Sequence, residues 1–564
     1  MKRKMTAVLE RWKSNPDKLA MVVTGSRQIG KTYIIDEFAR NNYENYLYID
    51  LSLDSEARGM FKGDISAKSL LGMIALRYPR FKVERGKSIL FLDEIQMCPG
   101  ARSAIKPLVA DGRLDVVASG SLLTVGGIRF GDEGRNSWRS AMPVAEGEMR
   151  EDGAVADTPL DATPQGDFEE RARLREGRVS PMGYETVVRM YAMDFEEYLW
   201  ALGVSEEQTA EIRARVRDRE PFPQPSLEAI NRYFRFYMAV GGLPRAVLES
   251  LKDPVPWNDV RDILRSDRNG YKSDVVEYAP PPIRDRVLAC IETMPVFLGK
   301  SNKRFVFSAA EGSDNVGWRE YENPVAWVTS AGMATPCWNV TEPVMPLKSR
   351  RDNMLKLYNF DTGLLLSSLE ASDARTDLMA SVIAGDAGVN QGAIVENAVA
   401  SMMEKCGFEL HYMERDRRLR DGTRDRIEID FIVDLGGDLA AVEVKSGKNR
   451  RSGSLEKLRT DPGYSMYPVK RFIKLENSNV RVDGNGVEHY PLFAAAFMDS
   501  MAGGRGLPER IERTPLGLRR QRQVALFLAK TRYPVCPRVS KDGLTPPGWT
   551  SMNLWMFSSA RTSA

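Results

Sequence analysis

The first 125 residues alternate short apolar runs with stretches of helical spacing, a pattern typical of a parallel sheet covered by helices. Four runs are expected to be strands because they are rich in Val, Ile, Leu and Tyr and apolar at nearly every position. They are residues 20–24, 46–52, 88–92 and 115–119. The pattern therefore predicts an α/β domain built on a buried parallel sheet.

A change of composition interrupts this domain, and the pattern then resumes. Residues 131–178 are rich in Asp, Glu, Gly, Pro, Ala and Arg and nearly lack apolar anchors, so we expect a disordered insertion there. A strand-like run follows at 185–191, and apolar residues return at helical spacing in 195–202. Residues 1–250 are therefore predicted to form one domain that contains the insertion.

The rest of the chain divides into two folded segments and a tail. In residues 251–385, two helical patterns precede strand-like runs at 334–340 and 355–360, an order that suits a winged helix. In residues 386–495, a helix precedes a hairpin and a second helix, which favours a small α/β domain. Residues 502–564 mix Arg-rich and Pro-rich stretches and are expected to be a poorly ordered extension.

The composition excludes several classes of protein. The chain is 43% hydrophobic and 28% charged, which is typical of globular proteins and argues against a fibrous or generally disordered chain. No apolar run approaches roughly 18 residues and the N-terminus has no secretion core, so we expect a cytoplasmic protein without a membrane partner. Five unpaired cysteines and two histidines argue against a disulfide framework, a zinc ribbon or a histidine-rich metal centre.

A glycine-rich motif follows the first predicted strand directly and precedes a helical stretch. It matches G-x-x-x-x-G-K-[S/T], in which glycines let backbone N–H groups wrap phosphates at a helix N-terminus. Lys31 is expected to bridge the outer phosphates, and the Thr32 hydroxyl is expected to help hold Mg²⁺. The sequence thus predicts a site for ATP and Mg²⁺ formed by Gly25, Ser26, Arg27, Gln28, Ile29, Gly30, Lys31 and Thr32.

Two later strands supply further candidates for this site. The run at 88–92 ends in Asp93 and Glu94, and we assign Asp93 to the Mg²⁺ shell and Glu94 to orienting or deprotonating the attacking water. Solvated acids at a strand end are the alternative. Ser119, at the end of the fourth strand, could sense the γ-phosphate, and a plain Ser-Gly turn is an equally good interpretation.

These motifs resemble those of prokaryotic AAA-type ATP-binding proteins related to archaeal ATPases. The resemblance rests on residues 25–32, 92–96, 118–122, 195–199 and the Gly-Gly-Leu-Pro turn at 241–244. It implies an ATPase core, a winged-helix segment and a restriction-endonuclease-like domain.

The resemblance extends over about residues 1–490, and the insertion and the tail depart from the family pattern. Arg245, which follows the Gly-Gly-Leu-Pro turn, is a candidate sensor of bound phosphate. An exposed arginine at a helix start is the alternative.

A hairpin is predicted near the end of the folded chain. Residues 426–434 and 439–445 alternate apolar and polar positions on either side of a Gly-Gly-Asp turn. Ile427, Ile429 and Phe431 are expected on one face, with the intervening acids on the other.

The polar face of this hairpin carries a possible catalytic pattern. Asp430 followed by Glu443-x-Lys445 fits the D…E-x-K arrangement of restriction-endonuclease-like nucleases, where carboxylates hold Mg²⁺ and the lysine orients water. Glu396, on the preceding helix, resembles the extra acid of such enzymes. A salt-bridged hairpin face exposed to solvent is the alternative.

A basic stretch follows the hairpin and could track a DNA or RNA backbone, although a charge run is commonly just a solvated face. It comprises Lys445, Lys448, Arg450, Arg451, Lys457 and Arg459. The formal net charge of the whole chain is only +3, so nothing beyond this local cluster argues for nucleic acid.

Three functional hypotheses fit these patterns. The leading one is an ATP-binding and ATP-hydrolysing protein that couples nucleotide state to a nuclease-like domain directed at DNA or RNA. The first rival is a nucleotide-controlled switch or scaffold that binds a partner without cleavage. The second is protein remodelling by a homo-oligomeric ring. The motifs alone do not separate these hypotheses.

Overall fold

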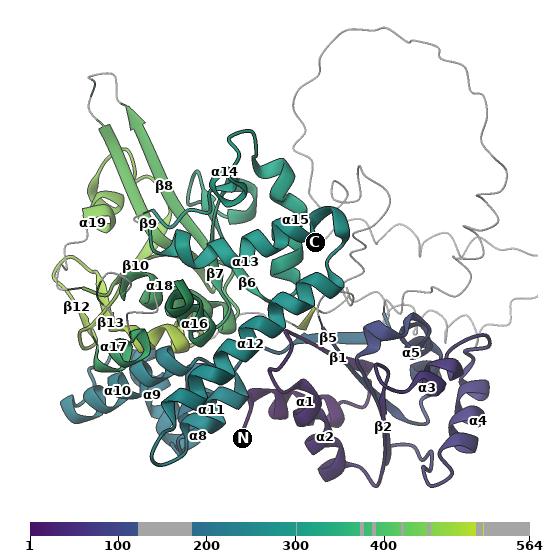
Figure 1. Cartoon of the computed structure of the whole chain (residues 1–564). Helices are drawn as coiled ribbons and strands as arrows, with labels where there is room; N and C mark the ends of the chain where they lie inside the picture. Colours follow the sequence, from purple (N-terminus) through teal and green to yellow (C-terminus); the bar gives the residue numbers. More distant parts are fainter. Residues whose placement is uncertain are drawn as a thin grey trace, which may run out of the picture. The chain divides into compact units, whose positions relative to one another are not determined.

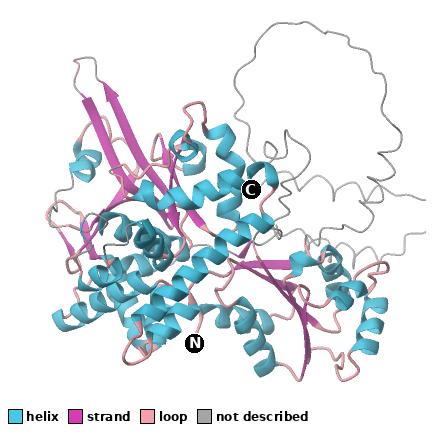
Figure 2. Cartoon of the chain, in the orientation of Figure 1, coloured by secondary structure: helices cyan, strands magenta, loops and turns pink. Residues whose placement is uncertain are grey.

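The computed structural model describes residues 1–121, 183–300, 302–372, 377–385, 388, 391–418, 422, 424–447, 453–502 and 511–512. All of them lie in one compact unit, Met1–Thr514 (Figure 2). The insertion predicted at 131–178 lies outside the described residues. So does the predicted tail, except for residue 502 and a short strand, β14 (Ile511–Glu512).

The first sheet has five parallel strands, with β14 added antiparallel at the edge beside β5. Its order is β2 (Asn45–Asp50), β3 (Ser88–Asp93), β4 (Asp115–Gly120), β1 (Ala20–Thr24) and β5 (Glu185–Arg189). Figure 1 labels β2, β1 and β5 of this sheet. The strands predicted from the apolar runs are thus confirmed, including the one that follows the insertion. Because the strands are parallel, the carboxyl ends of β1, β3 and β4 meet at one edge.

Helices cover both faces of this sheet because its strands alternate their side chains between two cores. Met21 and Val23 of β1 pack in the core that includes α1 (Lys4–Ser14) and α2 (Lys31–Asn42). Ala20 and Val22 belong to the opposite core. That core is covered by α3 (Ser55–Met60), α4 (Ala67–Arg77) and α5 (Pro99–Asp111).

A helical region follows β5. Its helices are α8 (Phe195–Ala201), α9 (Glu206–Asp218), α10 (Gln224–Val240), α11 (Pro244–Ser250), α12 (Trp257–Tyr278), α13 (Arg284–Leu298), α14 (Phe307–Glu311) and α15 (Trp318–Ser330). The sequence predicted α8, α10, α13 and α15, with α10 beginning earlier than expected. It did not predict α12, whose apolar residues are sparse among many charged ones.

The second sheet has eight strands in the order β12-β13-β11-β10-β9-β8-β6-β7. Its strands are β6 (Ala334–Val340), β7 (Arg351–Asn359), β8 (His411–Arg418), β9 (Arg424–Leu435), β10 (Asp438–Lys445), β11 (Val469–Glu476), β12 (Arg481–Val482) and β13 (Glu488–Pro491). The predicted hairpin is the antiparallel pair β9–β10. The two runs assigned to a winged helix form the pair β6–β7, which extends this sheet, so the winged helix is not confirmed.

Further helices pack around the second sheet. They are α16 (Thr362–Ser372), α17 (Leu378–Ala384), α18 (Gln391–Lys405), α19 (Gly453–Thr460) and the 3₁₀ stretch η5 (Leu492–Ala502). Of these, α18 was predicted at nearly the same bounds. It carries Glu396 and packs against β6, β7 and β10 of the sheet.

A bulge changes the face on which one residue of the predicted hairpin lies. His411 pairs with Ile432 whereas Met413 pairs with Ile429, so β9 carries one extra residue at this point. As a result Ile429 packs with Ile432, whereas Phe431 packs in the other core. The expectation that Phe431 shares a face with Ile429 is therefore wrong, because it assumed unbroken alternation.

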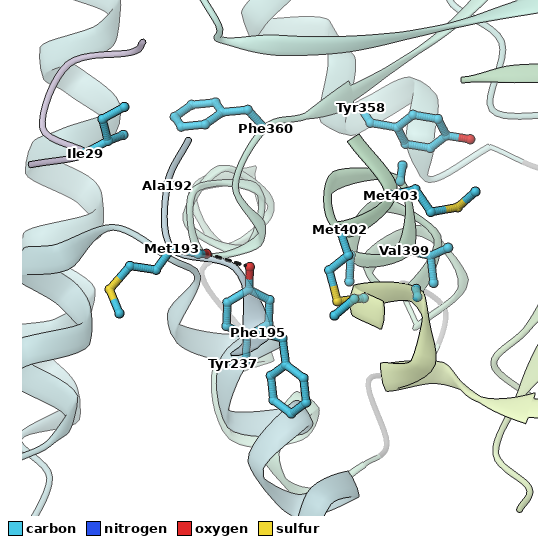
Figure 3. Packing of buried hydrophobic residues seen from close by; sticks show 14 of the residues in the cluster. Ile29, Ala192, Met193, Phe195, Tyr237, Tyr358, Phe360, Val399, Met402 and Met403 are labelled. Carbon is cyan, nitrogen blue, oxygen red and sulfur yellow. Dashed lines mark hydrogen bonds between the residues drawn. The ribbon is translucent and has the colours of Figure 1, made fainter. Parts of the chain in front are cut away.

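The largest core runs continuously from the phosphate loop to α18. Figure 3 shows Ile29, Phe360, Tyr237 and Met402 in this one cluster. Tyr237 donates a hydrogen bond to the Met193 carbonyl oxygen over 2.9 Å. The part that carries the first sheet and the part that carries the second sheet are therefore joined by packed side chains.

The Gly-Gly-Leu-Pro turn lies at this junction. The Gly242 N–H donates to the buried Asp361 carboxylate over 2.6 Å. A Cβ at Gly241 would collide with Asp361, and one at Gly242 would collide with the Met193 carbonyl. The two glycines are therefore required by close packing between the two parts.

Within the described residues, no helix is long and apolar enough to span a membrane. Cys98, Cys290, Cys337 and Cys406 are free thiols, as expected from their spacing. Cys536 lies outside the described residues.

Candidate functional site

The phosphate loop connects β1 to α2, as the motif predicts. Gly25 and Gly30 have φ of 154° and 91°, values that favour glycine, and a Cβ at Gly25 would collide with the Met190 carbonyl. Helix α2 begins at Lys31, immediately after Gly30. The loop therefore ends at a helix N-terminus, where N–H groups are free to bind an anion.

Lys31 is buried behind the loop. Its Nζ donates to the carbonyl oxygens of Gly25 over 3.0 Å and of Ser26 over 2.7 Å. Burial lowers the pKa of Lys31 to about 8, although the charges of Glu94 and Asp93 partly oppose this shift. The ammonium thus lies at the loop with neutral hydrogen-bond partners.

The predicted acid of the Mg²⁺ shell is surrounded by hydroxyls. Asp93 Oδ2 accepts from Thr32 Oγ1 over 2.8 Å and from the Tyr48 hydroxyl over 3.1 Å. Its Oδ1 accepts from the Glu94 N–H over 3.0 Å and from the Ser119 hydroxyl. The structure therefore brings Thr32, Asp93 and Ser119 together from α2, β3 and β4.

This arrangement fits a magnesium ion that is bound with a triphosphate. Hydroxyl and carboxylate oxygens are the ligands that Mg²⁺ prefers, and Thr32 and Asp93 place one of each side by side. Tyr48 was missed by sequence reasoning. The sequence feature that could have identified Tyr48 is its position on β2, the strand next to β3, where it pairs with Phe91.

Glu94 lies beside the loop in a left-handed conformation with φ of 50°. The Gln96 side-chain amide donates to its carboxylate. The charge of Glu94 acts on Lys31 and on Arg27, which places all three groups in one electrostatic neighbourhood.

The outer side of the loop contacts α12. Arg27 Nη1 lies 2.6 Å from Asp274 Oδ1, and its Nη2 donates to the Tyr278 hydroxyl over 2.8 Å. The Tyr271 hydroxyl donates to the Arg27 carbonyl oxygen over 2.5 Å. The side-chain amide of Gln28 lies against the Asp267 carboxylate.

Two more contacts hold residues of the loop and of α12. Arg245, the candidate phosphate sensor, pairs with Asp267 over 3.0 Å, and its side chain is 57% exposed. Ser26 Oγ donates to the Gly332 carbonyl oxygen over 3.2 Å. Sequence reasoning missed the α12 residues, although their positions 267, 271, 274 and 278 have the spacing of one helical face.

The second predicted site forms an acid cluster, by which we mean Glu396, Asp430 and Glu443. Glu396 is 2% exposed, and its Oε1 accepts from the Tyr358 hydroxyl over 2.6 Å and lies 3.5 Å from Lys356 Nζ. Its Oε2 accepts from Lys303 Nζ. Burial by itself would raise the pKa of Glu396, but the charges of Lys356 and Lys303 hold it below its usual range.

The other predicted residues lie in the same neighbourhood. Asp430 Oδ2 accepts from the Val444 N–H over 2.8 Å, and burial together with the charge of Glu396 raises the pKa of Asp430 to about 6. Glu443 Oε1 lies 2.5 Å from Lys445 Nζ, and its Oε2 is buried without a hydrogen-bond partner. The structure thus brings together the three residues of the D…E-x-K pattern and Glu396, the extra acid predicted on the preceding helix.

The acid cluster as arranged does not fit a divalent cation. Each oxygen of Glu396 already faces a proton donor, and Lys356 is fully buried, so a cation would have to displace it. Among the described residues, no group of three His, Cys, Asp or Glu is arranged to hold a metal. Sequence reasoning missed Lys303, Lys356 and Tyr358 because they lie outside the predicted domain.

The described part of the basic stretch is paired within the chain. Lys457 Nζ donates to Asp425, and Arg459 Nη2 lies 2.9 Å from Glu456 Oε1. Lys448, Arg450 and Arg451 lie outside the described residues. A path for a nucleic-acid backbone therefore stays a prediction.

Comparison with protein-family models gives three matches. Residues 17–127 match an AAA domain, residues 231–375 match a domain of unknown function (DUF8612), and residues 391–492 match another (DUF4143). The AAA match covers the phosphate loop, Asp93 and Ser119. Residues 17–127 are thus similar to an AAA domain, and they contain four strands of the parallel sheet.

Three solved structures show weak similarity. The Walker-type ATPase of Pyrococcus abyssi is 11% identical, with 65% of this chain and 95% of that chain covered and a TM-score of 0.32. The ORC1 protein of Aeropyrum pernix, solved in complex with DNA, is 12% identical, with 66% and 91% covered and a TM-score of 0.24. A protein from Vibrio cholerae is 11% identical, with 85% and 96% covered and a TM-score of 0.17. Similarities of this size carry no argument about function. A search of the curated proteins gives no match.

Proposed function

We propose that the chain binds ATP with Mg²⁺ at the loop Gly25 to Thr32 and hydrolyses it. The observation that carries this proposal is the convergence of Lys31, Thr32 and Asp93 behind a loop that ends at a helix N-terminus. Lys31 and Asp93 have neutral hydrogen-bond partners in the chain, so a charged ligand can engage them without breaking an ion pair.

Each residue has a distinct part in this proposal. Lys31 turns from its carbonyl partners to the outer phosphates, and Thr32 and Asp93 hold the magnesium ion, which neutralises phosphate charge when bound. Glu94 orients the attacking water or takes its proton. Ser119 senses the γ-phosphate and holds Asp93 in place, a role that its hydrogen bond to Asp93 supports.

The test is ATP turnover in Lys31→Ala. We expect turnover to fall at least about a hundredfold, because a charge-assisted contact to phosphate is lost from a buried site. Lys62→Ala, at an exposed position of the same domain, is the matched control and should match the wild type. Unchanged turnover in Lys31→Ala would refute the site.

We further propose that nucleotide state controls the C-terminal part, and that this part binds DNA or RNA without cutting it. The gathering of Glu396, Asp430, Glu443 and Lys445 supports a nuclease-like fold. The lysines that pair with Glu396 favour the non-cleaving alternative, because they stand where a cation would be needed.

A paired assay separates cleavage from binding. DNA and RNA are incubated with the full chain and ATP across Mg²⁺ and Mn²⁺, and both ATP turnover and strand integrity are followed. We expect nucleic acid to stimulate turnover while the strands stay intact. Cleavage that disappears in Asp430→Ala would contradict the non-cleaving proposal and support the nuclease hypothesis instead.

A further inference from the structure

One segment of the chain reaches both candidate sites. We call residues 257–359 the linking segment. It contacts the phosphate loop through α12 and Gly332, and it contacts the acid cluster through Lys303, Lys356 and Tyr358. A single connected segment therefore supplies partners to two sites that lie on different sheets.

At the first site, one face of α12 lies along the loop. Asp267, Tyr271, Asp274 and Tyr278 follow each other at spacings of four, three and four residues, so they form a single stripe. Asp267 and Asp274 are buried carboxylates, and each pairs with an arginine. A shift of the loop on binding phosphate would therefore change contacts along this whole stripe.

At the second site, the linking segment supplies the positive charge. Lys356 Nζ lies 3.5 Å from Glu396 and 3.4 Å from Glu428, and Lys303 Nζ donates to the other oxygen of Glu396. Neither lysine belongs to the matched region 391–492. The charge balance of the acid cluster thus depends on where the linking segment lies.

Tyr271 contacts both the phosphate loop and the residue that follows β7. Its hydroxyl donates to the Arg27 carbonyl, and its ring packs edge-on against Phe360, with ring centroids 5.3 Å apart. Phe360 directly follows β7, the strand that carries Lys356. Only one side chain therefore separates the phosphate loop from the end of β7.

The end of β7 is bound in turn to the helix that carries Glu396. Asn397 accepts from the Asn359 N–H over 2.7 Å and donates to the Asn359 carbonyl over 3.1 Å. Ser401 Oγ donates to the Phe360 carbonyl over 2.8 Å. Displacement of Phe360 would therefore move both Lys356 and α18.

We propose that the linking segment couples the two sites, so that nucleotide bound at the loop repositions β7 and α18 through Tyr271 and Phe360 and thereby changes the pairing of Lys303 and Lys356 with Glu396. This inference rests on the proposed ATP site. It gives that site a specific means of control over the acid cluster. Because coupling is reciprocal, a ligand that binds at the acid cluster changes nucleotide affinity by the same factor by which nucleotide changes the affinity for that ligand.

The test is hydrogen–deuterium exchange on the full chain with and without a non-hydrolysable ATP analogue and Mg²⁺. In the wild type we expect exchange to change at least about threefold at residues 25–32 and also at 300–306, 351–360 and 391–405. In Asp274→Asn and in Tyr271→Phe, the change at 25–32 should persist and the three distant changes should shrink.

The controls use the same helix. Asp262→Asn, at an exposed position of α12 away from the stripe, should behave as the wild type. Tyr271→Phe removes only the hydroxyl and keeps the ring against Phe360, so it remains informative if Asp274→Asn fails to fold.

Three outcomes would overturn different claims. A change confined to residues 25–32 in the wild type would refute the coupling and leave the ATP site standing. No change even at 25–32 would refute the ATP site on which the coupling rests. Distant changes that survive in Tyr271→Phe and Asp274→Asn would refute the route through α12.

Discussion

The phosphate loop and the acid cluster use the same kinds of side chain but give them different partners. At the loop, Lys31 donates to carbonyl oxygens, and Asp93 accepts from hydroxyls and an N–H. At the acid cluster, Glu396 accepts from two lysines, and Glu443 pairs with Lys445. At the loop the two charged groups have neutral hydrogen-bond partners, whereas at the acid cluster Glu396 and Glu443 pair with lysines and Asp430 accepts from a backbone N–H.

This difference separates a binding site from a closed ionic cluster. Burying a charge is unfavourable, and the lowered pKa of Lys31 reflects a cost of burial that the charges of Glu94 and Asp93 offset only in part. A pKa that is shifted in this way is typical of groups that act on a ligand. A buried cluster that already contains its counter-charges has no comparable need for a cation.

The largest expected effect is at Asp93. Asp93→Asn keeps the shape of the side chain but replaces one of its two acceptor oxygens with an NH₂ donor and removes the charge that would hold Mg²⁺. We expect ATP turnover to fall by about a thousandfold, roughly 4 kcal/mol in the activation barrier. Steady-state turnover measures this, with Asp17→Asn as the exposed control. Turnover within a few-fold of the wild type would place the metal elsewhere.

The second effect tests whether the acid cluster balances its own charge. Lys356→Met removes a fully buried ammonium and leaves Glu396 underneutralised, so the free energy of unfolding should fall by about 3 kcal/mol. Urea denaturation measures the loss, and Lys348→Met, at an exposed position of the linking segment, should cost little.

A metal titration sharpens the same comparison. Mn²⁺ without nucleotide should stabilise Lys356→Met and leave the wild type unchanged, since the ion can enter only when the ammonium is gone. If Mn²⁺ stabilises the wild type equally, and Asp430→Asn abolishes that effect, the acid cluster is a metal site as it stands.

The smallest effect is a pH dependence of ATP affinity. The folded-state pKa of Lys31 is lowered to about 8, so the free protein loses this positive charge as the pH rises through that value. A bound triphosphate favours the charged form, and affinity should therefore weaken about tenfold between pH 8 and pH 9.5. Lys31→Arg, which stays protonated, should show no such decline in calorimetric titrations.

Features fixed by local sequence were predictable. The strands around the phosphate loop, the start of α2 and the hairpin β9–β10 depend on short-range patterns, and the structure confirms them. The three residues of the D…E-x-K pattern also meet, because their register and strand direction follow from the hairpin itself.

Features that depend on distant segments were not predictable. Lys303 and Lys356 approach Glu396 from a part of the chain that the sequence assigned to a separate fold, and the bulge in β9 moves Phe431 to the other core without any local signal. The stripe on α12 was readable as a spacing, but nothing in the sequence indicated that it faces the loop.

Calorimetric titration of the full chain with ATP and Mg²⁺ tests the central claim most directly. The account predicts one ATP bound per chain, with binding lost in Lys31→Ala and kept in Lys62→Ala. No heat of binding in the wild type, or equal binding in Lys31→Ala, would contradict it.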